Sequence, residues 1–182
     1  MLSPTPKPVT PSAALVAWAN AVPNVLWSGL AFAPVVAFCY QHLPRPWLYG
    51  FGAVSLLAYA WPAAWLRRLQ LSEGVAAYQR LRVPALNRFT QNGSIINGLL
   101  RRRYSHYQPL STRAALAKLR STTYQQERFH WAALIFFLLA SGYALGLGLV
   151  GWAALLTGLN VGYNLYPIWL QQYLRLRLQR LS

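Results

Sequence analysis

Long apolar stretches alternate with polar ones along this chain, and the apolar stretches have the length of membrane spans. They lie within residues 13–40, 47–66, 129–147 and 150–170. A run of about 18 or more residues without charge can cross a bilayer as a helix and is too long for an ordinary buried core helix. We therefore predict an all-α fold, an integral membrane bundle of four transmembrane helices that forms a single membrane domain over residues 1–182.

Prolines and glycines predict how these spans bend and connect. Pro23 and Pro34 should bend the first span. The Gly-rich sequence GLGLVG joins the last two spans by a tight turn, so they should form an antiparallel hairpin. The tripeptide ANA near the N-terminus is compatible with a cleaved signal peptide. Because Pro-rich residues precede only a weak apolar core there, we expect the first span to be retained.

Charge is distributed very unevenly. The chain carries 17 Lys and Arg against two acidic residues, Glu73 and Glu127. Twelve of the cations lie in residues 67–128, three more lie in the C-terminal tail, and the other two are Lys7 and Arg45. An excess of Lys and Arg marks cytoplasmic loops. We therefore predict a multi-pass membrane protein with both termini in the cytoplasm.

The basic segment 67–128 alternates cations with Leu, Val, Phe and Tyr. This pattern is typical of short amphipathic helices on the inner leaflet, with basic side chains toward anionic lipids. The sequence TQNGS at 90–94 predicts a turn between two of them. Nucleic-acid binding is the weaker interpretation, because no recognition motif accompanies the cations. A third interpretation is that some of them, above all Arg101, Arg102 and Arg103, bind the phosphates of a soluble cosubstrate.

Metal and cofactor chemistry find little support in the composition. The lone Cys39 cannot form an intrachain disulfide, and His42, His106 and His130 lie far apart in the sequence. An E-x-x-H pair is part of the di-iron carboxylate pattern, but that pattern needs two copies and further glutamates. No phosphate-loop, dinucleotide or G-x-S-x-G motif occurs. We expect neither a metal nor a cofactor.

Polar residues form a ridge where the third span begins. Thr123, Glu127 and His130 follow one another at i, i+4 and i+7, so they lie on one stripe if this sequence is one helix. A glutamate one turn from a histidine can orient its imidazole and raise its basicity, as a general base requires. The alternatives are an acid that complements the helix dipole or pairs with Arg120 or Arg128, and an interfacial hydrogen bonder.

Two further polar stripes match this ridge. In the last span, five residues fall at relative positions 0, 4, 7, 11 and 15: Asn160, Asn164, Pro167, Gln171 and Arg175. The predicted hairpin places Gln171 on the same cytoplasmic side as Glu127. In the first span, interhelical hydrogen bonds of about 1 kcal/mol or less are the simpler explanation for the stripe of Asn20, Asn24 and Ser28.

The sequence TYQQERFHW, followed one span later by NLYPIWLQQYLRLRL, resembles the glycosyl-4,4'-diaponeurosporenoate acyltransferase family, bacterial membrane enzymes of carotenoid finishing. The family typically reads E-T-x-R-A-E-x-x-H-W and N-x-P-x-x-x-x-Q-R-Y-N-R-x-R-L. The matching residues are Thr123, Glu127, His130, Trp131, Asn164, Gln171, Tyr173, Arg175, Arg177 and Leu178. A Y-x-x-L-G-V segment also matches at Tyr78, Leu81 and Val83. Arg82 stands where that segment has Gly, and Gln172 where the second motif has Arg.

The resemblance implies transfer of a fatty acyl group from a cytoplasmic donor, acyl-CoA or another acyl thioester, to a hydroxyl of a glycosylated carotenoid or similar glycolipid. On this basis we assign His130 as the catalytic base, Glu127 as its orienter, and Asn164 or Gln171 as a donor to the oxyanion or the sugar. Substrate contacts are also expected from Thr123, Tyr173, Arg175, Arg177, Arg101, Arg102 and Arg103, with the arginines receiving donor phosphates.

A rival interpretation from another class is a non-catalytic membrane subunit that binds pigment or lipid. The eight Trp and 11 Tyr could line a polyene channel or belt the two membrane interfaces. A second rival is a transferase that acts on a different lipid or glycolipid at the same site. Replacing His130 separates an enzyme from a scaffold, and the mass of the product separates the two enzymes.

Overall fold

The computed structural model describes residues 10–90, 93–105 and 113–180, and the regular structure of these residues is helical throughout, as predicted. The elements in chain order are α1 (Ala13–His42), α2 (Arg45–Leu56), the 3-10 helix η1 (Leu57–Ala60), α3 (Ala63–Arg68), α4 (Val75–Arg80), α5 (Val83–Leu86), the 3-10 helix η2 (Asn87–Phe89), α6 (Ser94–Arg103), α7 (Arg113–Gly146), α8 (Val150–Asn160), the π-helix η3 (Val161–Leu165) and α9 (Tyr166–Gln179).

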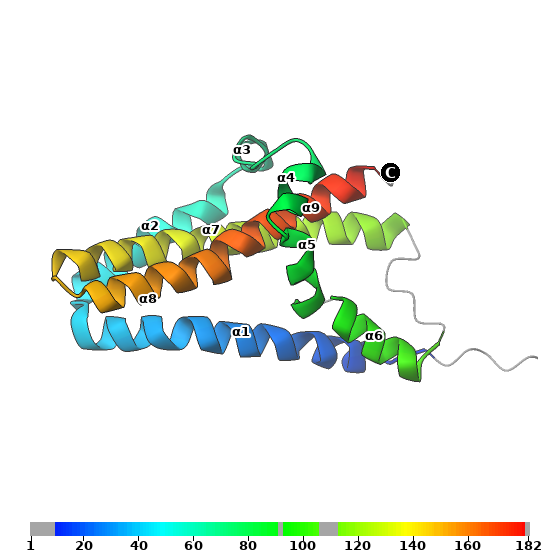
Figure 1. The fold of residues 1–182 in the computed structure, drawn as a ribbon, viewed down its shortest axis with the longest axis horizontal. Coiled ribbons are helices and arrows are strands. Elements are labelled where there is room, and N and C mark those ends of the chain that lie inside the picture. The colour runs from blue at the N-terminus through cyan, green and yellow to red at the C-terminus, as the bar shows by residue number, and fades with distance from the viewer. Residues whose placement is uncertain (1–9, 91–92, 106–112, 181–182) are drawn as a thin grey trace, which may run out of the picture.

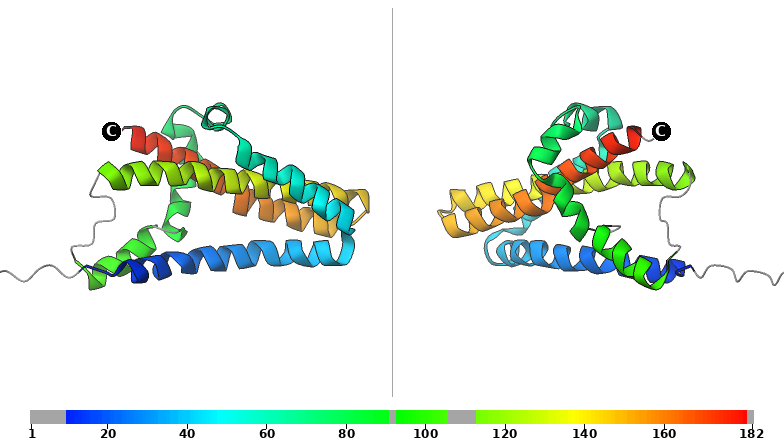
Figure 2. Two further views of the ribbon diagram at one scale, coloured as in Figure 1. Left: turned by 180° about the vertical axis from the view of Figure 1, so that it is seen from behind. Right: turned by 45° about the vertical axis from the view of Figure 1, so that its right-hand side comes forward.

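Three long rods form the body of the molecule: α1, α7, and the continuous run of α8, η3 and α9 (Figure 1). The turn after α1 and the turn between α7 and α8 lie at one end. The first residues of α1, helix α6, the start of α7 and the end of α9 lie at the other end, and the views in Figure 2 agree. Segments far apart in the sequence therefore meet at the same end of the bundle.

Within the residues that the structure describes, two helices are long and apolar enough to cross a membrane, Ala13–His42 and Leu116–Gly146. The first is capped by Ser12, whose hydroxyl accepts the Leu15 N–H at 3.2 Å. It continues as one helix through Pro23 and Pro34. The second begins well before residue 129, because the basic amphipathic sequence in front of the predicted span continues the same helix.

The other two predicted spans are interrupted, so four uninterrupted spans are not observed in the described residues. In the stretch 47–66, helix stops at Ala60, Trp61 is extended (φ −64°, ψ 124°), and Pro62 has no N–H to continue the ladder. In the stretch 150–170, the π-helix η3 separates α8 from α9 without ending the rod.

The main core lies where α1, α7 and α8 meet. Its buried members are Ala31, Val35, Phe38, Phe137, Ala140, Ala144, Ala153 and Leu156. The alanines let the helix backbones approach closely, as in membrane helix interfaces. The predicted hairpin of α7 and α8 is confirmed: Leu149 N–H bonds to the Ala144 carbonyl, and Gly148 takes the positive φ of 73° that the turn requires.

The segment after α2 crosses the bundle as short helices, as its amphipathic pattern predicts. Helices α4 and α5 pack on α9 through the buried cluster of Tyr78, Val83, Leu170 and Tyr173. At the far side, Trp27 of α1 donates its indole N–H to the Phe89 carbonyl at 3.1 Å. In the predicted turn 90–94, Gly93 donates to Thr90, whereas residues 91 and 92 lie outside the described residues.

Arg82, between α4 and α5, has a left-handed backbone with φ 55°. We expect Arg82→Gly to stabilise the protein by roughly 0.5–1 kcal/mol, because relief of the left-handed strain exceeds the extra entropy of the unfolded chain. Thermal unfolding of the purified protein in detergent measures the change. The matched control is Arg80→Gly in α4, which should destabilise by up to about 1 kcal/mol. Destabilisation by both substitutions would contradict the prediction.

Candidate functional site

The predicted polar ridge of α7 is turned toward the rod of α8, η3 and α9. Thr123, Glu127 and His130 are only 1%, 0% and 9% exposed. Their spacing places them on one helical stripe, as the sequence indicates. Burial of an acid and a histidine between two helices requires polar partners on the facing rod, because an unpaired buried charge is costly.

The facing rod is irregular beside His130. Pro167 lacks the N–H that would bond to the carbonyl four residues earlier. The Tyr166 N–H instead bonds to the Val161 carbonyl, five residues back, and the π-helix η3 results. Asn164, fully buried, lies in this segment. Such π-helical turns are frequent at functional sites.

His130 belongs to a chain of side-chain amides. Its Nδ1 lies 3.4 Å from Asn164 Oδ1, Asn164 Nδ2 donates to Asn160 Oδ1 at 2.8 Å, and Asn160 Nδ2 donates to the Leu134 carbonyl at 3.1 Å. Each amide nitrogen is a donor, so Asn164 presents its oxygen to the imidazole. With Asn164 Oδ1 as the acceptor, Nδ1–H is the donor, and a neutral ring then has its lone pair on Nε2.

Aromatic rings surround this imidazole and tie it to α1. The rings of Phe129 and Tyr163 lie edge-on to His130, with centroids 5.1 and 5.6 Å away. The Tyr163 hydroxyl is 2.7 Å from Ser28 Oγ. For Ser28, this contact confirms the predicted interhelical hydrogen bond.

Glu127 has different partners from those the sequence suggests. Its Oε1 accepts a hydrogen bond from Gln172 Nε2 at 2.9 Å, and its Oε2 forms an ion pair with Arg175 Nη1 at 2.5 Å. Arg128 donates to the Trp61 carbonyl instead of pairing with Glu127. Asn164 contacts the His130 ring, while the Glu127 carboxylate joins α7 to α9; the role of Glu127 as orienter of His130 stays a prediction.

Arg175, which the sequence assigns to donor phosphates, is paired within the protein. Its side chain is 1% exposed, and its guanidinium lies 4.3 Å from the centroid of the Tyr124 ring. One carboxylate and one aromatic face offset its charge. Asn164 Nδ2 uses one of its two N–H groups on Asn160 Oδ1, and its role as a donor to the oxyanion stays a prediction.

Gln172 is a residue of this site that was not predicted from the sequence. There it was noted only because it differs from the Arg of the family motif. Besides Glu127, it binds Leu71 N–H at 3.2 Å and the Tyr78 hydroxyl at 3.1 Å through Oε1. Its Nε2 also reaches the Leu69 carbonyl at 3.4 Å. Burial raises the pKa of Tyr78, so its hydroxyl remains a donor. Gln172 thereby fixes the segment before and within α4 to α9.

The remaining predicted residues are dispersed. Gln171 is half-buried, and Tyr173 is buried against Tyr78. Arg177 lines a hollow of about 470 Å³ together with Val75, Gln79, Tyr173 and Arg180. The cluster Arg101–Arg103 is exposed at the end of α6. Figure 1 shows α6 beside the first turns of α1, away from α9, so the structure does not bring these two groups of arginines together.

The fold and site define a class: a helical protein with two candidate membrane helices and a buried histidine–amide relay. Residues 62–182 match the profile of the glycosyl-4,4'-diaponeurosporenoate acyltransferase family, and the chain belongs to that family. Membership implies an acyltransferase that acts on a glycosyl carotenoid in carotenoid biosynthesis. No curated protein and no solved structure matches the chain.

The buried pair of Glu127 and Arg175 gives a prediction about stability. Arg175→Met should destabilise the protein by about 3–5 kcal/mol, because it leaves the Glu127 carboxylate buried without its cation. The double variant Glu127→Gln/Arg175→Met removes both charges and should recover most of that loss. Thermal and denaturant unfolding in detergent measure both effects. Arg177→Met, at an exposed site, is the control. A double variant no more stable than Arg175→Met would contradict this account of the pair.

Proposed function

We propose that this chain is a membrane-embedded O-acyltransferase that moves a fatty acyl group from a cytoplasmic thioester to a sugar hydroxyl of a glycosyl carotenoid. Family membership supports the reaction class. The observation that carries the assignment of the site is the His130–Asn164–Asn160 relay, which sets the imidazole tautomer in a buried position. The thioester donor, His130 as base and the position of the site belong to the proposal.

The reaction needs one base that later acts as an acid. His130 Nε2 takes the proton of the sugar hydroxyl as the oxygen attacks the thioester carbonyl, and a C–O bond forms. The C–S bond then breaks, and the departing thiolate receives the proton from Nε2. Asn164 accepts the Nδ1–H bond throughout and so stabilises the imidazolium that forms between the two transfers. Asn164 and Asn160 are thus positioning residues.

Glu127, Gln172 and Arg175 serve this site indirectly. Their contacts hold α9 against α7 one turn from His130, and so keep η3 in register with the imidazole. They also fix α4 on α9. Under this proposal Glu127 touches neither substrate, and its replacement acts through the position of Asn164.

We also propose that the rods cross the membrane with the end formed by α6 and the C-terminal part of α9 in the cytoplasm. The two long apolar helices support a membrane location. Four crossings would be made by α1, by α2 with the residues that follow it, by α7, and by the rod of α8 and η3. The cations of 67–128 favour this orientation. An amphiphilic acceptor in the bilayer and a cytoplasmic donor would then meet near His130.

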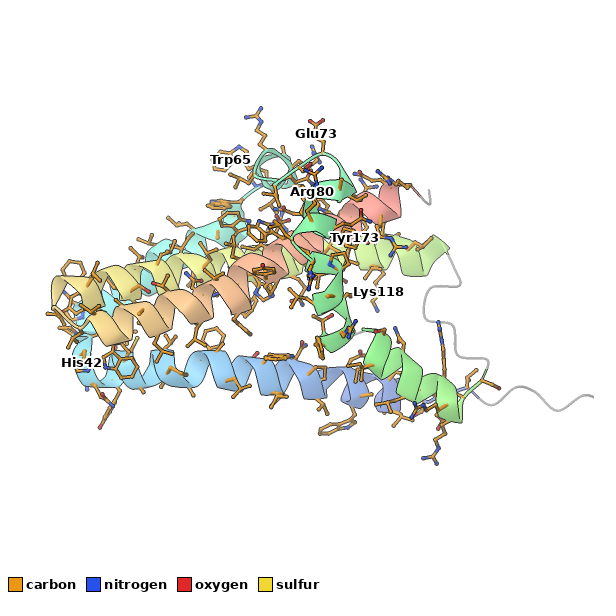
Figure 3. The ribbon with its side chains drawn as sticks, in the orientation of Figure 1. His42, Trp65, Glu73, Arg80, Lys118 and Tyr173 are labelled. Atoms are coloured by element: carbon orange, nitrogen blue, oxygen red, sulfur yellow. The ribbon has the colours of Figure 1, made fainter. Side chains whose placement is uncertain are left out.

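His130→Gln should lower acyl transfer at least about 100-fold, because general-base catalysis contributes factors of that size. Cells that make the glycosyl carotenoid and express each variant are analysed by lipid mass spectrometry, with membrane abundance measured by blot. The product is heavier than its precursor by one acyl chain. His42→Gln is the matched control, since His42 lies at the far end of α1 (Figure 3).

Two results would overturn the assignment. If His130→Gln forms product like His42→Gln at equal abundance, His130 is not the base. If no acylated species appears even with wild type while pigment or lipid co-purifies with the protein, the non-catalytic subunit becomes the better interpretation.

The orientation is tested by cysteine labelling in a Cys39→Ser background. A membrane-impermeant maleimide on intact spheroplasts should label Leu147→Cys, in the turn between α7 and α8. Ser105→Cys, at the end of α6, should react only after permeabilisation. Both residues are exposed, so accessibility to the reagent reports the side of the membrane. The reverse labelling pattern would contradict the proposed orientation.

A further inference from the structure

The hollow between α4 and α9 has the chemistry of an anion site. Arg177 of α9, Arg180 at the C-cap of α9 and Gln79 of α4 supply donors, while Tyr173 and Val75 complete the lining. Neither of the two acidic residues of the chain, Glu73 and Glu127, belongs to this lining. The Arg177 guanidinium lies 6.0 Å from the centroid of the Tyr173 ring. Within the described residues neither guanidinium has a carboxylate partner, and two such groups favour a phosphate or diphosphate.

The walls of this hollow are held in place by the buried network. Tyr78, in α4, binds Gln172 through its hydroxyl and packs its ring against Tyr173, the two centroids being 6.3 Å apart. Gln172 in turn binds Glu127. The hollow is therefore a fixed feature of the docking between α4 and α9. Figure 3 shows Tyr173 on α9 beside the short helices that cross it.

One stripe of α9 leads from this hollow toward the level of His130. Tyr166, Trp169, Tyr173, Arg177 and Arg180 recur at relative positions 0, 3, 7, 11 and 14, so they lie on one face of the helix. The rings of Tyr166 and Trp169 pack edge-on, with centroids 5.1 Å apart. The stripe is thus cationic at the end of the helix and aromatic toward η3, which carries Asn164.

We propose that this hollow binds the phosphate groups of the acyl donor. The proposal rests on the proposed function, since it names the donor of that reaction as a phosphorylated thioester. Along the axis, at 1.5 Å per residue, Arg177 lies about 20 Å from Asn164. The side chain of a helical residue points back toward the helix N-terminus, and a pantetheine arm, as long as roughly four or five extended residues, adds about 15 Å.

The assignment keeps Arg177, which the sequence already placed at the donor phosphates, and puts Arg180 in the place of Arg101–Arg103 and Arg175. Arg175 is buried on Glu127, and the α6 cluster lies beside α1. Arg177 and Arg180 are exposed and share one hollow with the aromatic stripe. Arg180 was not among the residues that the sequence singled out.

The test measures coenzyme A binding to the full chain in nanodiscs of zwitterionic lipid by calorimetry. Arg177→Gln/Arg180→Gln should weaken binding at least about tenfold, with a reduced dependence on salt. Arg67→Gln/Arg68→Gln, which removes the same charge from the exposed end of α3, should bind like wild type. Pantetheine, which lacks phosphates, should bind weakly and equally to all three. Equal coenzyme A affinity of the two double variants would overturn the proposal.

Two further arms identify the source of the phosphate and separate this proposal from the proposed function. If the hollow binds a lipid headgroup, nanodiscs of anionic lipid should stabilise wild type but not Arg177→Gln/Arg180→Gln, and coenzyme A should not bind. That result would overturn the assignment of the hollow to the acyl donor. Coenzyme A binding needs no turnover, so His130→Gln should bind it like wild type. Retained binding with no acyl transfer by wild type supports the hollow and rejects the reaction.

Discussion

The rest of the structure depends on the contact of Glu127 with Gln172 and Arg175. In a chain with 17 cations, this is the acid that is fully buried, and its carboxylate is shared by an amide and a guanidinium from one helix. The carboxylate joins α7 to α9, and Gln172 extends the connection to Tyr78 in α4. One of its oxygens accepts a hydrogen bond from Gln172 and the other is paired with the Arg175 charge, which offsets the cost of burying the carboxylate.

The contacts of Glu127 with Gln172 and Arg175 are separate from those of His130. Glu127 and His130 are neighbours on α7, yet the carboxylate is committed to the ion pair and the imidazole to Asn164. A buried carboxylate already neutralised by Arg175 adds little negative charge beside the imidazole. The neutral amide of Asn164 fixes the ring tautomer without adding a charge at the site. In the proposed reaction, the imidazolium is then a transient species and not the resting state.

The sequence was sufficient for the pattern along each helix but not for contacts between helices. Periodicity placed Glu127 and His130 on one buried stripe, because that depends only on spacing. Which residues face each other across two helices depends on how each helix is rotated about its axis, and the sequence does not give this rotation. It therefore did not identify the partners of Glu127. The helix break at Pro62 could have been predicted from the sequence, because proline ends helices. The prediction of one continuous span over 47–66 relied on hydrophobicity alone and did not include this break. Gln172 gave no signal beyond differing from the family motif, and its partners come from a segment far away in the chain.

The π-helix explains how one rod presents both sets of partners to α7. A regular helix turns about 100° per residue, so Asn160 and Gln172, twelve positions apart, would point about 120° apart. A π-helical turn accommodates one extra residue, which removes roughly one residue's rotation and brings the two side chains nearly into line. The irregularity follows from Pro167, which cannot donate to the carbonyl four residues earlier. Pro167 thus sets the rotation of the helix about its axis. With this rotation, Asn164 contacts His130, Asn160 supports Asn164, and Gln172 contacts Glu127.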